Sequence, residues 1–163
     1  MNIQDFLLDG LDSFNPDERE TALRKLIDRK QRSLHAPGTN VNMHFHSFFS
    51  YNSEGWSPSR IAWESRKAGL YAAGLCDFDV LDGLEEFLHA GRVVRLRSSV
   101  NLETRAFFRE YASVDISSPG EPGVTYIMGA GFARNPAAGS PQERGLAAYR
   151  ARAKARNAAL IAR

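Results

Sequence analysis

The segment from Tyr71 to Asp79 reads YAAGLCDFD. Its short, nearly continuous apolar run, ending in acidic residues, is typical of a buried strand in a parallel sheet. Before it, SPSRIAWESRKAGL (57–70) predicts a helix capped by Ser57, with Pro58 in the first turn. After it, VLDGLEEFLHAGR (80–92) predicts a helix that ends near Gly91. A strand between two helices is the repeating unit of α/β folds.

The same alternation continues on both sides of this segment. Further strands are predicted in VNMHFH (41–46), in VVRLRSSVNLETRAFF (93–108), where the strand closes on Glu103, and in VTYIMGAGF (124–132). Outer helices are predicted from Asn15 to Lys30, and from Ser140, Pro141 and Glu143 to the end of the chain. This order predicts an α/β fold of parallel strands joined by crossover helices.

Composition restricts the class of protein. The chain has 163 residues, of which 43% are hydrophobic and 25% charged, so it is long enough for one domain with a hydrophobic core. Its net charge of +2 is too small to indicate nucleic-acid binding over the whole chain. The single cysteine, Cys76, excludes an internal disulfide, and neither a signal peptide nor a membrane span is evident. We therefore expect a cytoplasmic protein that does not enter a membrane; its oligomeric state is open.

Imidazole and carboxyl groups gather at the predicted strand ends. His44 and His46 share one face of their strand, because side chains alternate along a strand. Asp77, Asp79 and Glu103 lie at or just past the ends of other strands. In an α/β barrel this is the functional end, and nitrogen with oxygen ligands favours Zn²⁺, Mn²⁺ or Fe²⁺ over Ca²⁺ or Mg²⁺.

This pattern has a second interpretation. A histidine pair on a strand can equally be a solvated polar face, and Glu103 beside Arg105 can form a surface ion pair. His-x-His alone is a weak motif for a metal site.

The segment 40–105 as a whole resembles the opening of a PHP domain, a domain of the polymerase and histidinol phosphatase family of metal-dependent phosphoesterases. That family has a His-x-His after its first strand, a Thr-Asp-His type motif after its second and a Gly-x-Glu type motif after its third. The corresponding places here hold His44 and His46, the CDFD sequence around Asp77, and the NLE sequence that ends at Glu103. Their order and spacing are much more specific than the histidine pair.

The resemblance implies a fold, a site and an activity. Residues 40–163 would be the N-terminal part of a distorted TIM-like (β/α)7 barrel, preceded by a helical extension at 1–39. His44, His46 and Glu103 would bind one or two divalent transition-metal ions, and Asp77 or Asp79 would take part in catalysis by orienting water or a ligand histidine. The implied reaction is hydrolysis of a small phosphorylated substrate by metal-activated water.

The chain also departs from the family pattern. Phe78 and Asn52 stand where the family has histidines that serve a third metal position, so we expect no third site. No histidine follows His89, although the family draws further ligands from later strands. We therefore expect an incomplete barrel from a longer protein, with weak or no catalysis by these 163 residues alone; a short, degenerate PHP protein is the alternative.

Two other functions remain open. One is a non-catalytic binding module that retains part of the site. The other is nucleic-acid association, which we do not expect, through the basic residues of the last helix: Arg144, Arg150, Arg152, Lys154, Arg156 and Arg163. That helix also reads as an ordinary amphipathic barrel helix with an apolar stripe: Leu146, Tyr149, Ala153 and Leu160.

Overall fold

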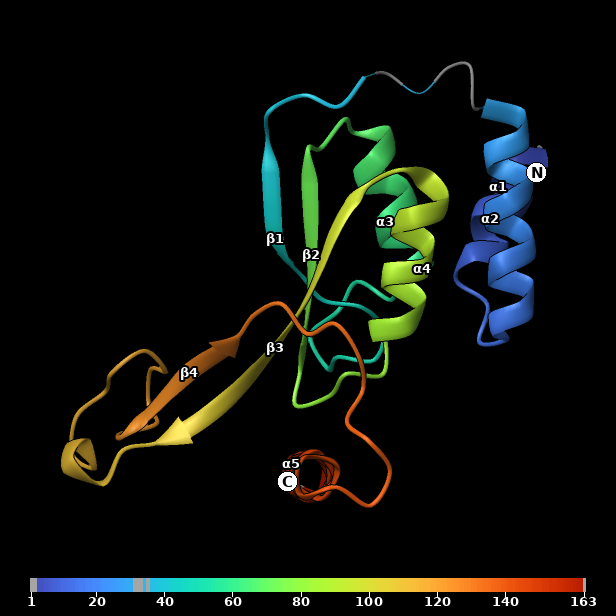
Figure 1. The fold of residues 1–163 in the computed structure, drawn as a ribbon. Coiled ribbons are helices and arrows are strands. Elements are labelled where there is room, and N and C mark those ends of the chain that lie inside the picture. The colour runs from blue at the N-terminus through green and yellow to red at the C-terminus, as the bar shows by residue number, and fades with distance from the viewer. Residues whose placement is uncertain (1–2, 31–33, 35, 163) are drawn as a thin grey trace.

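The computed structural model describes residues 3–30, 34 and 36–162. Over these residues the chain forms a mixed α/β fold in which helices cover one face of a curled four-stranded sheet (Figure 1). In chain order the elements are α1 (Ile3–Leu11), α2 (Pro16–Lys30), β1 (Val41–Phe45), α3 (Pro58–Lys67), β2 (Ala72–Phe78), α4 (Leu84–Val94), β3 (Arg97–Phe107), the short 3-10 helix η1 (Arg109–Tyr111), β4 (Val124–Gly129) and α5 (Pro141–Ile161). The α/β class is therefore as predicted, and the sheet is consistent with part of a barrel.

The sheet has the spatial order β1-β2-β3-β4. The first three strands are parallel, and the crossover helices α3 and α4 that join them pack on the same face. Because each crossover returns the chain to the same end of the sheet, the carboxyl ends of β1, β2 and β3 lie together. This edge of the sheet holds the candidate site.

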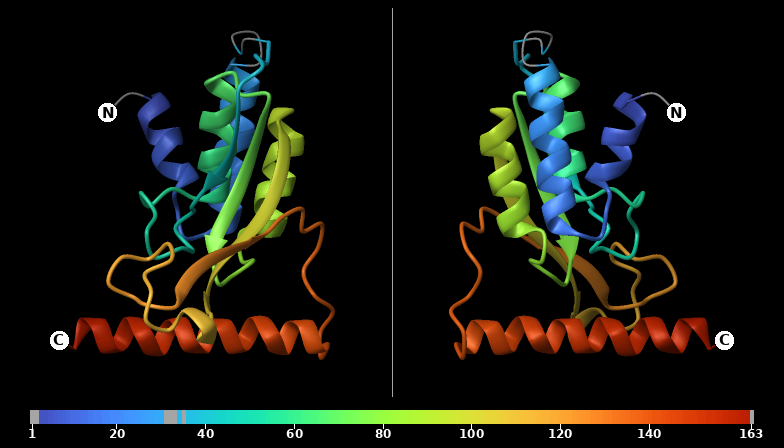
Figure 2. Two further views of the ribbon diagram at one scale, coloured as in Figure 1. Left: turned by 90° about the vertical axis from the view of Figure 1, so that its left-hand side faces the viewer. Right: turned by 90° about the vertical axis from the view of Figure 1, so that its right-hand side faces the viewer.

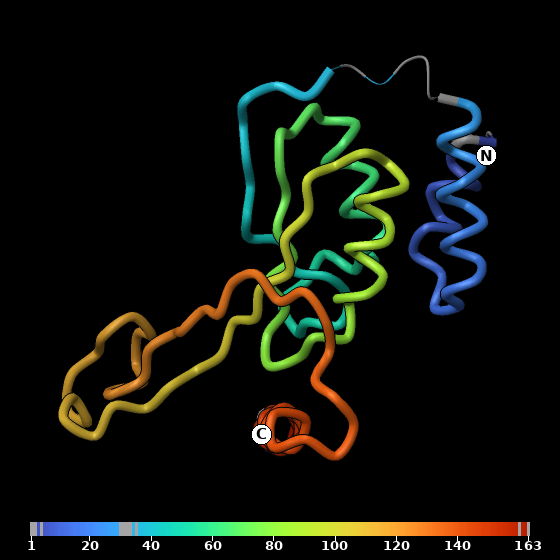
Figure 3. Tube along the Cα trace, in the orientation of Figure 1, coloured from blue at the N-terminus to red at the C-terminus, as the bar shows by residue number. Residues whose placement is uncertain are grey.

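The fourth strand runs antiparallel to β3, so the expectation of parallel strands throughout is wrong for β4. No crossover helix separates the two strands: the connection is a turn-rich loop with the single turn η1, and it returns the chain directly (Figure 3). The prediction that the third strand closes on Glu103 is also wrong. Only the parallel pairing with β2 stops there, and β3 continues for four residues beside β4.

Local capping signals place the helix starts correctly. The Ser57 hydroxyl accepts a hydrogen bond from the backbone N–H of Arg60, and the Ser140 hydroxyl accepts one from that of Glu143. At the end of α4, however, the prediction of a stop near Gly91 is wrong, because the helix continues to Val94. Gly91 serves packing instead: a Cβ at this position would lie 2.9 Å from Cβ of Ser98.

The N-terminal helices share the core of the sheet domain. Figure 1 shows α1 and α2 as an additional layer over α3 and α4. Their buried residues belong to the same apolar cluster as those of the sheet and its crossover helices: Leu7, Leu11, Ala22, Leu23 and Leu26. Residues 3–30 therefore contribute directly to the stability of the fold.

The last helix, α5, lies across the carboxyl ends of the parallel strands (Figure 2). It does not cover a face of the sheet as α3 and α4 do. Of the predicted stripe, Leu146 and Ala153 are half-buried and Tyr149 is exposed, while the side chain of Leu160 and all of Arg163 lie outside the described residues. None of the described helices is both long and apolar enough to cross a bilayer.

Candidate metal centre

Three side chains meet at the carboxyl edge of the parallel strands. His44 lies in β1, His46 directly follows that strand, and Glu103 lies in β3 where its pairing with β2 stops. Each offers one potential ligand atom, and these atoms all lie within 4.8 Å of one another. Oε2 of Glu103 is 2.9 Å from Nε2 of His44 and 3.7 Å from Nε2 of His46. The expected convergence is present, and the role of these residues as ligands stays a prediction.

A glycine in β2 allows the two flanking strands, β1 and β3, to contact each other across it. The side-chain amide of Asn101 in β3 donates a hydrogen bond of 3.0 Å to the backbone carbonyl of Met43 in β1. This bond crosses β2 at Gly74, where a Cβ would lie 2.6 Å from that carbonyl oxygen. Gly74 therefore lets a side chain of β3 reach the backbone of β1 across the intervening strand.

The donor set and its spacing suit a divalent transition-metal ion. Two atoms bound to one tetrahedral Zn²⁺ at about 2.1 Å each are separated by roughly 3.4 Å. The two separations from Glu103, 2.9 and 3.7 Å, lie on either side of this value, within a group whose ligand atoms lie up to 4.8 Å apart. Two imidazoles and one carboxylate form a nitrogen-rich set, which favours Zn²⁺, Mn²⁺ or Fe²⁺ over Ca²⁺ or Mg²⁺.

The surroundings of His46 favour the neutral imidazole that metal binding requires. Burial lowers the pKa of His46, and the neighbouring His44 lowers it further. Its Nδ1 is buried without a hydrogen-bond partner of normal geometry, although the backbone of Cys76 lies nearby. A neutral ring with a nitrogen directed at a carboxylate is ready to act as a ligand near neutral pH.

Phe78 forms an aromatic floor beside the two histidines. Its ring stacks on His46 with a centroid distance of 5.1 Å and an interplanar angle of 5°. Tyr51 and Tyr126 contact the same ring at centroid distances of 4.9 and 5.6 Å. A phenyl ring has no lone pair to donate to a metal ion, which is the reason to expect no third ion here. That expectation stays a prediction.

Asp77 lies on the other side of β2. It pairs in register with the core residue Leu102, whereas Phe78 pairs with Glu103, so Asp77 and Glu103 point to opposite faces. Its two carboxylate oxygens accept hydrogen bonds from the backbone N–H of Ser47 at 2.6 Å and from the Ser47 hydroxyl at 2.7 Å. The structure thus shows Asp77 holding the loop that follows His46. Its catalytic role stays a prediction.

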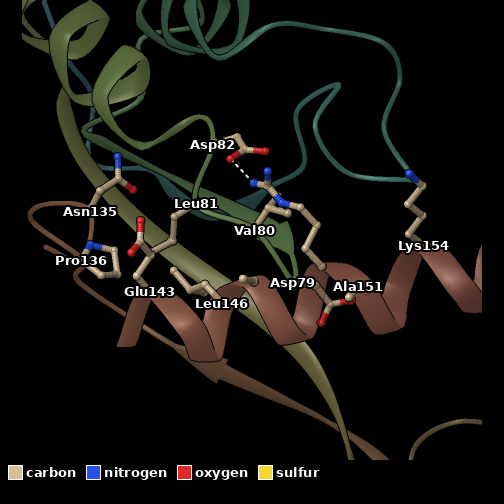
Figure 4. A pocket seen from close by; sticks show the side chains of 12 residues that line it. Asp79, Val80, Leu81, Asp82, Asn135, Pro136, Glu143, Leu146, Ala151 and Lys154 are labelled. Atoms are coloured by element: carbon tan, nitrogen blue, oxygen red, sulfur yellow. Dashed lines mark hydrogen bonds and ion pairs between the residues drawn. The ribbon is translucent and has the colours of Figure 1, made fainter. Parts of the chain in front are cut away.

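Asp79 is also directed away from the histidines. It has a positive φ of 60°, and its carboxylate accepts a hydrogen bond of 2.6 Å from the Thr104 hydroxyl. With α5 it lines a pocket of about 490 Å³, in which Arg150 pairs with Asp82 (Figure 4). Within the described part of the chain, the cluster of side chains that could together hold a metal ion consists of His44, His46 and Glu103 and does not include Asp77 or Asp79.

The buried Asp77 carboxyl should make the stability of the fold depend on pH. Burial raises its pKa to about 6, although the bonds from Ser47 oppose the increase. The folded protein therefore binds a proton more readily than the unfolded chain between pH 4 and 6, and this group removes stability as the pH rises through that window. Asp77→Asn removes the titrating carboxyl, so its free energy of unfolding should fall less steeply with pH than that of the wild type, by up to about 1.4 kcal/mol per pH unit. Urea unfolding followed by circular dichroism measures both slopes.

The matched control for this measurement is Asp28→Asn on the exposed side of α2. It should keep the wild-type dependence of unfolding free energy on pH. Equal slopes for wild type and Asp77→Asn between pH 4 and 6 would contradict the prediction.

Sequence reasoning missed several residues that surround the candidate centre. Ser47, Tyr51 and Tyr126 gave no signal, because their partners are distant in the chain. The sequence suggests Arg105 only as a partner of Glu103, whereas the structure pairs it with Glu121. Its position two residues after Glu103 does place it on the same face of β3, which strand alternation alone could have indicated.

Comparison with known proteins gives limited similarity. No family model matches the chain, and no curated protein matches it significantly. Among solved structures, a candidate metal-dependent phosphoesterase from Bifidobacterium adolescentis is similar over 47% of this chain, with 25% sequence identity and a TM-score of 0.41. The matched region spans 26% of that protein. A similarity of this extent does not assign the chain to a family.

Proposed function

We propose that this chain binds a divalent transition-metal ion through His44, His46 and Glu103 and takes part in hydrolysing a phosphate ester. The observation that carries the proposal is the meeting of these three side chains, with ligand atoms within 4.8 Å of one another. When bound, such an ion lowers the pKa of water and withdraws charge from a phosphate oxygen. The resemblance of the motifs to those of the PHP family supports the same reaction.

The protein residues have distinct tasks in this proposal. Glu103 supplies one negative charge, which offsets part of the charge of a dication, and its side chain is only 9% exposed. The half-buried ring of His46 is held by stacking on Phe78, which also keeps solvent from that side of the ring. His44 is more open, with 44% of its side chain exposed, and it leaves an approach for a small phosphorylated substrate.

One ion fits this ligand set better than two. A two-metal phosphoryl site needs ligands for both ions at a separation of about 3.5 to 4 Å. Among the described residues, His44, His46 and Glu103 are the members of the single candidate group. We therefore expect slow turnover by this chain at best.

A non-catalytic metal-binding module is the second candidate. It is favoured by the placement of Asp77, whose two carboxylate oxygens are bonded to Ser47 on the opposite face of β2. With that carboxylate directed away, no base in the described cluster is free to activate water except the ligands themselves.

An assay with a generic phosphomonoester separates the two candidates. The purified chain is supplied with Mn²⁺, Zn²⁺ or Fe²⁺, and release of inorganic phosphate is compared between wild type and the His44→Ala, His46→Ala double variant. Metal-dependent release that the double variant lacks is the result expected for the hydrolase. Metal binding without release identifies the binding module, and the absence of both metal binding and release contradicts both candidates.

A further inference from the structure

A positively charged side chain, Arg105, lies next to the candidate metal centre. Arg105 shares a face of β3 with Glu103, because the two residues are separated by one position in the strand. In the antiparallel pair, Arg105 lies opposite Tyr126, whose ring contacts Phe78. From Arg105 the neighbours lead through Tyr126 and Phe78 to His46. The Arg105 side chain is 20% exposed.

A second guanidinium reaches the same place from α5. The Arg156 guanidinium carbon lies 5.3 Å from the centroid of the Tyr51 ring. Tyr51 in turn contacts the Phe78 ring. Burial raises the pKa of Tyr51, and Arg156 and Arg105 both oppose this increase. Arg156 lies over Tyr51 and Arg105 is paired with Tyr126, so both arginines border the two rings that contact Phe78.

An internal carboxylate already occupies part of this location. Glu121, from the loop between β3 and β4, forms an ion pair with Arg105 and also accepts a hydrogen bond from Ser118. The Ser118 bond, Arg105 and Arg156 all lower the pKa of Glu121. The Arg105–Glu121 ion pair therefore shows that a carboxylate can be held at this position.

The donors of Arg105 are only partly used. A guanidinium has five N–H donors, and Glu121 engages Nη2. Nε of Arg105 is buried and has no hydrogen-bond partner. Donor capacity of Arg105 therefore remains for an oxyanion beside the triad of His44, His46 and Glu103.

We propose that Arg105 and Arg156 form a phosphate-binding subsite next to the metal centre, where Glu121 competes with the phosphate group of a substrate. The inference rests on the proposed function, because it names residues that hold the phosphoryl group which the metal centre would act on. Arginine suits this role because its planar donors match the oxygens of phosphate. In this arrangement Arg105 and Arg156 are positioning residues, and displacement of Glu121 frees the Arg105 donors.

The test measures binding of inorganic phosphate to the metal-free full chain by isothermal titration calorimetry. Arg105→Ala should weaken phosphate binding by about tenfold or more, because charge-assisted hydrogen bonds are lost. Glu121→Gln should tighten binding by about threefold or more, because the competing charge is removed. A purely structural role for this ion pair would not change phosphate affinity in opposite directions.

Arg144→Ala is the matched control. It removes the same charge from the same helix, but Arg144 lies near the start of α5, about three turns before Arg156, and donates a hydrogen bond to the backbone carbonyl of Gly139. Its effect on phosphate affinity should stay within about twofold. If circular dichroism shows that Arg105→Ala is unfolded, Arg105→Lys replaces it, and a loss of affinity is again expected because the planar donor fork is absent.

The outcomes separate this inference from the proposed function. Opposite changes in Arg105→Ala and Glu121→Gln establish the subsite even if no metal binds. Unchanged phosphate affinity in both variants, or no phosphate binding by the wild type, overturns the subsite even if metal-dependent hydrolysis is observed.

Discussion

His46→Ala is expected to lower the affinity of the chain for Zn²⁺ by on the order of 100-fold or more. The imidazole is one of three donors from the protein, so its removal leaves two donors and open coordination positions for water. His46 is also the histidine held most firmly, since its ring stacks on Phe78 and its side chain is only 17% exposed. The loss should therefore not be recovered by movement of another side chain.

The measurement is a competition titration against a chromogenic Zn²⁺ chelator, and His89→Ala is its control. His89 lies on α4 and bonds Glu20 of α2 rather than the candidate centre. This control should bind Zn²⁺ as the wild type does. An equal loss in both variants, or no loss in His46→Ala, would refute the assignment of His46 as a ligand.

Replacing Arg19 with alanine is expected to lower the free energy of unfolding by about 4 kcal/mol. Arg19 on α2 pairs with Glu86 on α4 through two contacts, of 2.9 and 2.5 Å, and the two side chains are only 6% and 19% exposed. Glu86 also accepts hydrogen bonds from the backbone and hydroxyl of Ser59. Removing the guanidinium leaves a largely buried carboxylate without its counter-charge, which costs more than the pair itself contributes.

The control uses another arginine of the same helix. Arg24 pairs with Glu20, but its side chain is 59% exposed, so Arg24→Ala should cost less than about 1 kcal/mol. Chemical unfolding followed by circular dichroism measures both values. Adding Glu86→Gln to Arg19→Ala should recover part of the loss, and a small loss in Arg19→Ala would show that the N-terminal helices are only loosely attached to the sheet domain.

Features that depend on close neighbours in the chain were predictable from the sequence. Ser57 and Ser140 cap their helices as expected, because a cap is completed by residues within one turn. The strand at Ala72–Phe78 was visible from its apolar run. Strand alternation also placed His44 and His46 on one face, and the crossover pattern brought their strand to the same sheet edge as Glu103.

Features that depend on distant partners were not predictable in the same way. Nothing in VTYIMG indicates whether the strand runs parallel or antiparallel, because its direction is set by the preceding connection and by pairing with β3. Gly91 has the usual signature of a helix end, yet close contact with Ser98 gives it a packing role inside α4.

The candidate site likewise combines features that the local sequence predicts with features that only long-range packing decides. Amino-acid type and strand period identified His44, His46 and Glu103 as residues that could share an ion, since ligand chemistry belongs to each residue and alternation is local. The tertiary structure decided that Asp77 bonds Ser47 behind the sheet, that Phe78 stacks on His46 and that Arg156 of α5 lies over the Tyr51 ring. These arrangements join residues far apart in the chain, and long-range packing selects one of many pairings that the local sequence permits equally well.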